Sequence, residues 1–78
     1  MKRVVGRVAF PLHGLSWGGD EASSVERALA GVHGVVRAYV NATMEMAYVE
    51  YDPEMTTTKE FSRAVAAVGL DAGEPVVL

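Results

Sequence analysis

The sequence contains no cysteine, and this absence excludes several chemistries at once. Disulfides, catalytic thiolates and cysteine-ligated zinc or iron–sulfur sites all require that residue. Basic residues are also few, because seven Lys and Arg stand against ten Asp and Glu, for a net charge of −3 at pH 7. With so little positive charge and no basic stripe, we expect no nucleic-acid partner.

Long apolar runs are missing as well. No stretch approaches the ~20 apolar residues that a membrane-spanning helix needs, so we expect no membrane span. The opening MKRVVGRVAFPL has a basic start and apolar residues like a signal peptide, but Arg7 and His13 interrupt it, and its removal would delete a needed strand. We therefore expect a cytoplasmic protein with a single domain over residues 1–78.

The spacing of the apolar residues does carry a signal. Apolar residues recur at every second position, as in a strand, then at nearly every fourth, as in a helix, and then at every second again, and this alternation occurs twice along the chain. Val8, Phe10 and Leu12 alternate with polar or small residues and predict a first strand. Thr57 and Glu60 form a candidate capping box for a second helix, and PVVL at 75–78 predicts a short closing edge strand. Two helical stripes complete the pattern: Ala22, Val25, Ala28 and Leu29, ended by Gly31 and Gly34, and Phe61, Ala64, Val65 and Val68, ended by Gly69.

Between the helices, VVRAYVNATMEMAYVEYD predicts a hairpin. A turn centred on Thr43 and Met44 fixes its register. The outward pairs are then Tyr39 with Tyr48 and Arg37 with Glu50, while Ala38, Val40, Ala47 and Val49 face the helices. The resulting order, βαββαβ, predicts an α+β ferredoxin-like fold in which two helices cover one face of a four-stranded antiparallel sheet.

Four stretches in the order FPLHGLS, ASSVERALAGVHGVVRAYVN, AYVEYDPE and FSRAVAAVGL cover most of the chain. In this order they resemble the heavy-metal-associated (HMA) domain of copper chaperones, mercury-binding proteins and metal-pumping P-type ATPases. That family holds a soft cation in a Cys-x-x-Cys loop. Here Trp17 stands in the first cysteine's place, Asp20 or Glu21 in the second, and the loop is one residue longer. Binding of Cu(I) by thiolates is therefore excluded.

The resemblance and the topology together leave a metal-handling function open. One end of the sheet should gather seven side chains: His13, Trp17, Asp20, Glu21, Met44, Met46 and Asp71. In this hypothesis His13 binds Zn(II), Ni(II) or Co(II) with Asp20 or Glu21, possibilities that imidazole and carboxylate ligands allow. These residues also have a purely structural interpretation, without metal. His13 would then be solvated, Asp20 and Glu21 would stabilise the helix through its dipole, and Met44 and Met46 would only pack against their neighbours.

The alternative is a protein-interaction or regulatory module that has lost metal binding. It would dock a partner protein, or a second copy as a homodimer, through Trp17 or through Tyr39, Met46 and Tyr48 on the open sheet face. A glycine-flanked Trp17 either packs on the domain or anchors a partner. We expect that the chain is not an enzyme, because the sequence indicates no catalytic triad around Ser16, Ser23 or Ser24.

Overall fold

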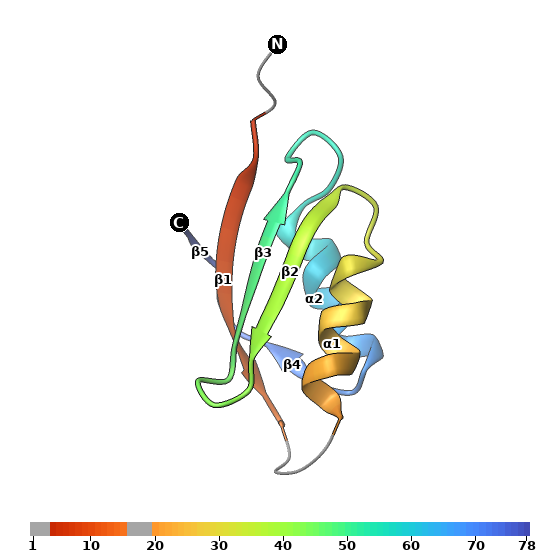
Figure 1. Ribbon diagram of the computed structural model, residues 1–78, viewed down its shortest axis with the longest axis vertical. Coiled ribbons are helices and arrows are strands. Elements are labelled where there is room, and N and C mark those ends of the chain that lie inside the picture. Colours follow the sequence, from red (N-terminus) through yellow and green to blue (C-terminus); the bar gives the residue numbers. More distant parts are fainter. Residues whose placement is uncertain (1–3, 16–19) are drawn as a thin grey trace.

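The computed structural model describes residues 4–15 and 20–78 (Figure 1). Its elements are β1 (Gly6–His13), α1 (Glu21–Ala30), β2 (Val35–Asn41), β3 (Met46–Tyr51), α2 (Thr58–Ala67), β4 (Asp71–Ala72) and β5 (Val76–Val77). The strands form one antiparallel sheet in the order β2-β3-β1-β4, with β5 also paired to β1. Both helices lie on one side of the sheet, so the predicted ferredoxin-like fold is confirmed.

The core lies between the helices and the sheet. Val25 and Leu29 from α1 and Phe61 and Val65 from α2 are fully or almost fully buried, as their helical spacing predicted. They pack against six buried sheet residues: Val8, Phe10, Leu12, Val40, Ala47 and Val49. At one margin of the core Phe61 meets the Tyr51 ring edge to face, with centroids 5.0 Å apart. The core therefore occupies only one face of the sheet and leaves the other face open.

The fourth position of the sheet is divided between β4 and β5. The sequence predicted one closing strand at 75–78, but β4 pairs with the end of β1 and β5 with its middle. Between them Gly73 passes close over Pro11, whose carbonyl accepts the Gly73 N–H at 2.8 Å. A Cβ on Gly73 would collide with Cγ of the Pro11 ring. Pro75 has no N–H to offer a ladder, so the pairing stops before β5 resumes it.

The second helix begins where the sequence predicted, but without the predicted capping box. Thr57 is the extended N-cap residue of α2, and its side chain makes no capping hydrogen bond. The hydrogen bond found there is between backbone groups: the Glu60 N–H donates to the Thr57 carbonyl at 3.1 Å. The Glu60 carboxylate accepts a hydrogen bond from Arg63 instead, also at 3.1 Å. The capping-box prediction was wrong because Glu60 pairs forward along the helix.

The β2–β3 hairpin has the predicted register, with Tyr39 opposite Tyr48 and Arg37 opposite Glu50. Its turn lacks Asn-Gly, and Asn41 supplies a substitute, because its Oδ1 accepts the Met44 N–H at 3.0 Å. Glu45 closes the turn with φ of 54°. The turn and the alternation of apolar residues therefore agree on a single register.

β2 is an outer strand of the sheet, and α1 covers part of its edge. The Val40 N–H donates to Oε2 of Glu26 on α1 at 3.0 Å. Near the other end of β2 the pairing with β3 shifts between Val35 and Arg37. Side-chain partners and bulges both oppose the addition of another strand to a sheet edge.

Candidate functional site

The end of β1 is flanked by the hairpin turn on one side and by β4 on the other. The Leu12 N–H donates to the Glu45 carbonyl at 2.8 Å, and His13 pairs with Asp71 of β4. Figure 1 shows the end of β1, the hairpin turn and β4 at the same end of the molecule. The predicted gathering of these elements is therefore correct. Trp17, which the sequence placed there, lies outside the described residues.

His13 is exposed and lies on the open side of the sheet, since it alternates with the buried Leu12. Its imidazole lies against Gly73, because a Cβ built on that glycine would be 3.2 Å from Nε2 of His13. The strand register places Asp71 directly across from it. The register therefore pairs a residue with an imidazole and a residue with a carboxylate, two ligand types that borderline divalent ions accept, but the two side chains form no ion pair.

The other predicted ligands belong to the start of α1. Asp20 is the N-cap residue and Glu21 the first residue of the helix, where both carboxylates favour the helix dipole. Oε1 of Glu21 is buried and accepts no hydrogen bond from the described part of the chain. Within residues 4–15 and 20–78, no three His, Asp or Glu side chains converge as a metal site would require. The ligand set of His13 with Asp20 or Glu21 therefore stays a prediction.

The two methionines at this end differ in setting. Met44 is exposed at the hairpin turn, while Met46 is half-buried on β3, opposite Pro11 and Asn41. Met46 belongs to the open sheet face, as predicted, because it alternates with the buried Ala47. Neither thioether has a histidine or cysteine partner given by the strand register.

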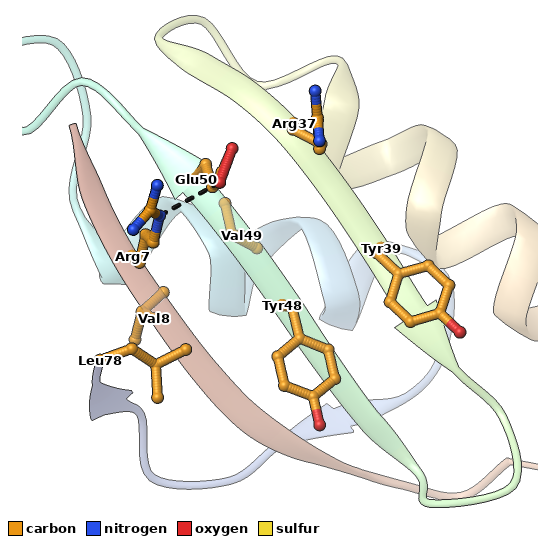
Figure 2. Close-up of a pocket in the computed structure, with 8 residues that line it drawn as sticks. All are labelled: Arg7, Val8, Arg37, Tyr39, Tyr48, Val49, Glu50 and Leu78. Atoms are coloured by element: carbon orange, nitrogen blue, oxygen red, sulfur yellow. Dashed lines mark hydrogen bonds and ion pairs between the residues drawn. The ribbon is translucent and has the colours of Figure 1, made fainter.

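The open sheet face carries a shallow groove of about 210 Å³ (Figure 2). At one end Tyr39 stacks on Tyr48, with ring centroids 6.1 Å apart and planes inclined by 26°. At the other end Nε of Arg7 donates to Oε2 of Glu50 at 3.2 Å. Residues from four strands or their flanks line the groove: Arg7, Val8, Arg37, Tyr39, Tyr48, Val49, Glu50 and Leu78.

Sequence reasoning found the two tyrosines of this groove but missed Arg7 and Leu78 as their neighbours. The hairpin fixes only β2 against β3, whereas Arg7 comes from β1 and Leu78 follows β5. The Leu78 N–H donates to the Arg7 carbonyl at 2.9 Å and holds the two residues side by side. The outward position of Arg7 in the strand alternation was the one available signal.

The side chains of the groove carry a net positive charge, whereas the other described charged side chains are mostly acidic. Two arginine side chains and one carboxylate side chain line the groove. All other described charged residues comprise three Lys or Arg and nine Asp or Glu. A ligand with negative charge would therefore be drawn to this face and repelled by most of the remaining surface. The described helices are also too short to cross a membrane.

No protein-family model and no curated protein matches this chain, but solved structures do. The N-terminal domain of PacS from Synechocystis PCC6803 is 34% identical, with a TM-score of 0.70, covering 92% of this chain and 96% of that one. The N-terminal domain of a potential copper-translocating P-type ATPase from Bacillus subtilis, Cu(I)-loaded, is 26% identical, with a TM-score of 0.82 and coverage of 90% and 86%. The CopZ metallochaperone is 29% identical, with a TM-score of 0.79 and coverage of 85% and 97%.

Proposed function

Because this chain belongs to the heavy-metal-associated domain family, we propose that it serves metal trafficking as a protein-docking domain that carries no soft metal ion itself. Its similarity to a metallochaperone and to the domain of a potential copper-translocating ATPase supports the link to metal trafficking. We place it in the cytoplasm and assign it no catalysis. The observation that carries the docking function is the groove on the open sheet face.

The donor set argues against a soft metal ion as cargo. Cu(I) selects thiolate and thioether sulfur, and the chain has no cysteine. At the end of β1, His13 and Asp71 offer imidazole and carboxylate, hard or borderline donors that do not favour Cu(I). The thioethers of Met44 and Met46 lie at the same end, but the strand register gives them no cysteine or histidine partner. The residues present therefore do not fit the family's thiolate chemistry.

The groove supplies what a docking domain needs. It combines a stacked aromatic pair, of which Tyr39 is 53% exposed, with charged groups at its opposite end. Aromatic and arginine side chains contribute a large share of the binding energy at protein interfaces. The Trp17 loop remains a second proposed anchor for the same partner.

A Cu(I) competition experiment tests the first half of this proposal. The purified chain is mixed with Cu(I) and a thiolate chelator, and the metal is assigned to protein or chelator by separation and metal analysis. We expect the chelator to take all of the metal. Stoichiometric retention by the protein would contradict the proposal and would identify Met44 and Met46 as functional ligands.

A divalent metal site is the second candidate, and the pairing of His13 with Asp71 is the observation that favours it. Zn(II), Ni(II) and Co(II) are titrated into the chain while backbone amide shifts and the fluorescence of its single tryptophan are recorded. The docking proposal expects no saturable shift at millimolar metal. Saturable shifts around His13 and Asp20 would establish metal handling instead.

Two histidine variants make that titration specific. If the divalent site exists, His13→Ala should abolish most of the binding, because it removes the only imidazole at that end among the described residues. His33→Ala is the matched control, since His33 is also exposed but lies in the segment between α1 and β2. Equal loss in both variants would indicate non-specific binding and would contradict a site at the end of β1.

A further inference from the structure

We infer that the groove on the open sheet face binds an extended acidic segment of a partner protein, with a carboxylate at its arginine end and an apolar or aromatic side chain on its tyrosine end. This inference rests on the proposed docking function and specifies the chemistry of the partner. Three features of the groove support it: an arginine without an ion pair among the described residues, a stacked aromatic pair, and the spacing between them.

The arginine end holds one guanidinium, that of Arg37, without an ion pair among the described residues. Glu50 has the single carboxylate side chain of the groove, and its Oε2 accepts a hydrogen bond from Nε of Arg7 at 3.2 Å. Arg37 stands opposite Glu50 in the strand register but forms no ion pair with any described residue. In Figure 2 the dashed line joins Glu50 to Arg7 and none reaches Arg37. A guanidinium with unused donors favours a carboxylate, which it can bind through two parallel hydrogen bonds.

The tyrosine end offers an apolar surface. The Tyr39 and Tyr48 rings stack on each other, and Figure 2 shows them extending along the same side of the sheet. Leu78, which is 68% exposed, lies across the groove from them. An aromatic or branched side chain placed here would leave water on contact with two rings and an aliphatic group.

The spacing of the two ends specifies the sequence of the ligand. Arg37 and Tyr39 are two residues apart on β2, as are Glu50 and Tyr48 on β3, so the ends lie about 7 Å apart along the strands. A peptide extended along the groove also repeats its side chains on one face every second residue. The groove therefore matches an acidic residue followed or preceded, two positions away, by an apolar or aromatic residue.

Two other occupants fit the observations less well. Arginine and exposed aromatics also bind single-stranded nucleic acid, but the nine acidic residues elsewhere on the described chain would repel a run of phosphates. A second copy could offer its own acidic and apolar segment, Glu74 to Val76. In each copy, however, Val76 is already paired with Ala9 of β1. A partner protein with one or two local carboxylates meets neither obstacle.

A peptide titration followed by NMR tests this inference on the full chain. The peptides GSGEGFGSG and GSGEFGGSG have the same composition, but only the first places Glu and Phe two positions apart. We expect saturable amide shifts on β1, β2 and β3 with the first peptide, and at least about fivefold weaker binding with the second, because adjacent side chains point to opposite faces. Equal affinities, or no shifts, would overturn the inference.

Matched arginine variants locate the site. Arg37→Gln should weaken binding about tenfold by removing a charge-assisted contact, whereas Arg27→Gln, which removes the same charge from the exposed face of α1, should leave affinity unchanged. Amide dispersion verifies that each variant is folded. Equal weakening by both variants would show that only net charge matters and would contradict the groove.

Two further measurements exclude the other occupants. Tighter binding of a ten-residue oligothymidylate than of the Glu-x-Phe peptide, at the same amides, would overturn the inference in favour of nucleic acid. Concentration-dependent sedimentation of the chain alone, with shifts on the same strands, would overturn it in favour of a second copy. All titrations contain EDTA, so a failure here is independent of the metal experiments and leaves the Trp17 loop as the proposed docking element.

Discussion

Replacing Gly73 with alanine puts a methyl group where the structure has the ring of Pro11. The added Cβ would collide with Cγ of that ring and would lie 3.1 Å from its Cδ and 3.2 Å from Nε2 of His13. The ring is held in β1 and cannot rotate away, so the segment between β4 and β5 must lift from the sheet. Overpacking of this kind costs about 1–3 kcal/mol, and loss of the 2.8 Å hydrogen bond to Pro11 adds about 1 kcal/mol.

We therefore expect Gly73→Ala to lower the free energy of unfolding by about 2–4 kcal/mol. A domain of this size has roughly 4–12 kcal/mol in total, so the variant should fold but melt at least about 8 °C lower. Urea denaturation followed by circular dichroism measures the first quantity and a thermal scan the second. Gly31→Ala is the control, because Gly31 has φ of −81° and a Cβ there would meet its nearest atom at 3.4 Å. It should be neutral or slightly stabilising.

A double-mutant cycle with Pro11→Ala decides whether crowding is the cause. Without the ring, Gly73→Ala has room for its methyl group, and most of the lost stability should return. A coupling energy above about 1 kcal/mol is expected for two side chains in direct contact. If the two substitutions are additive within about 0.5 kcal/mol, the crowding argument is refuted.

Two other substitutions test the core and the surface. Leu29→Ala should lower the free energy of unfolding by about 2–5 kcal/mol in urea, because Leu29 is fully buried between α1 and the sheet, and a loss below 1 kcal/mol would show that the helix is loosely packed. Arg7→Gln should cost less than about 1 kcal/mol, because the Arg7 side chain is 65% exposed in its ion pair with Glu50. That small difference should shrink further in 1 M NaCl, and a salt-independent loss would contradict a screened surface pair.

The sequence predicted best where local patterns and their consequences coincide. In the hairpin, alternation of apolar residues and a short turn allow one register, and the structure has that register from Arg37 to Asn41. The family resemblance followed from the order of the same stretches and is confirmed by the solved relatives. The buried faces of both helices were likewise readable from their spacing.

Prediction failed where contacts between distant residues decide the outcome. The split of the last strand depends on how closely Gly73 passes Pro11, which no local pattern encodes. The capping box failed because Glu60 has a competing partner in Arg63. The groove requires Arg7 and Leu78 to meet the hairpin, and the pairing of three strands had to be known first. The divalent site gains only the pairing of His13 with Asp71, since its remaining ligands are not brought together among the described residues.

The hydrogen bond between Val40 and Glu26 makes the protection of the outer edge of β2 depend on α1. Val40 presents its N–H at the outer edge of β2, and the Glu26 carboxylate occupies it only while α1 is docked. If α1 detaches, it uncovers that donor and the apolar faces of Val25 and Leu29 in a single step. Such an intermediate exposes both an unpaired strand edge and an apolar surface, and these two features together favour the growth of fibrils. Local opening of α1 would therefore be enough to expose this strand edge, without global unfolding of the domain.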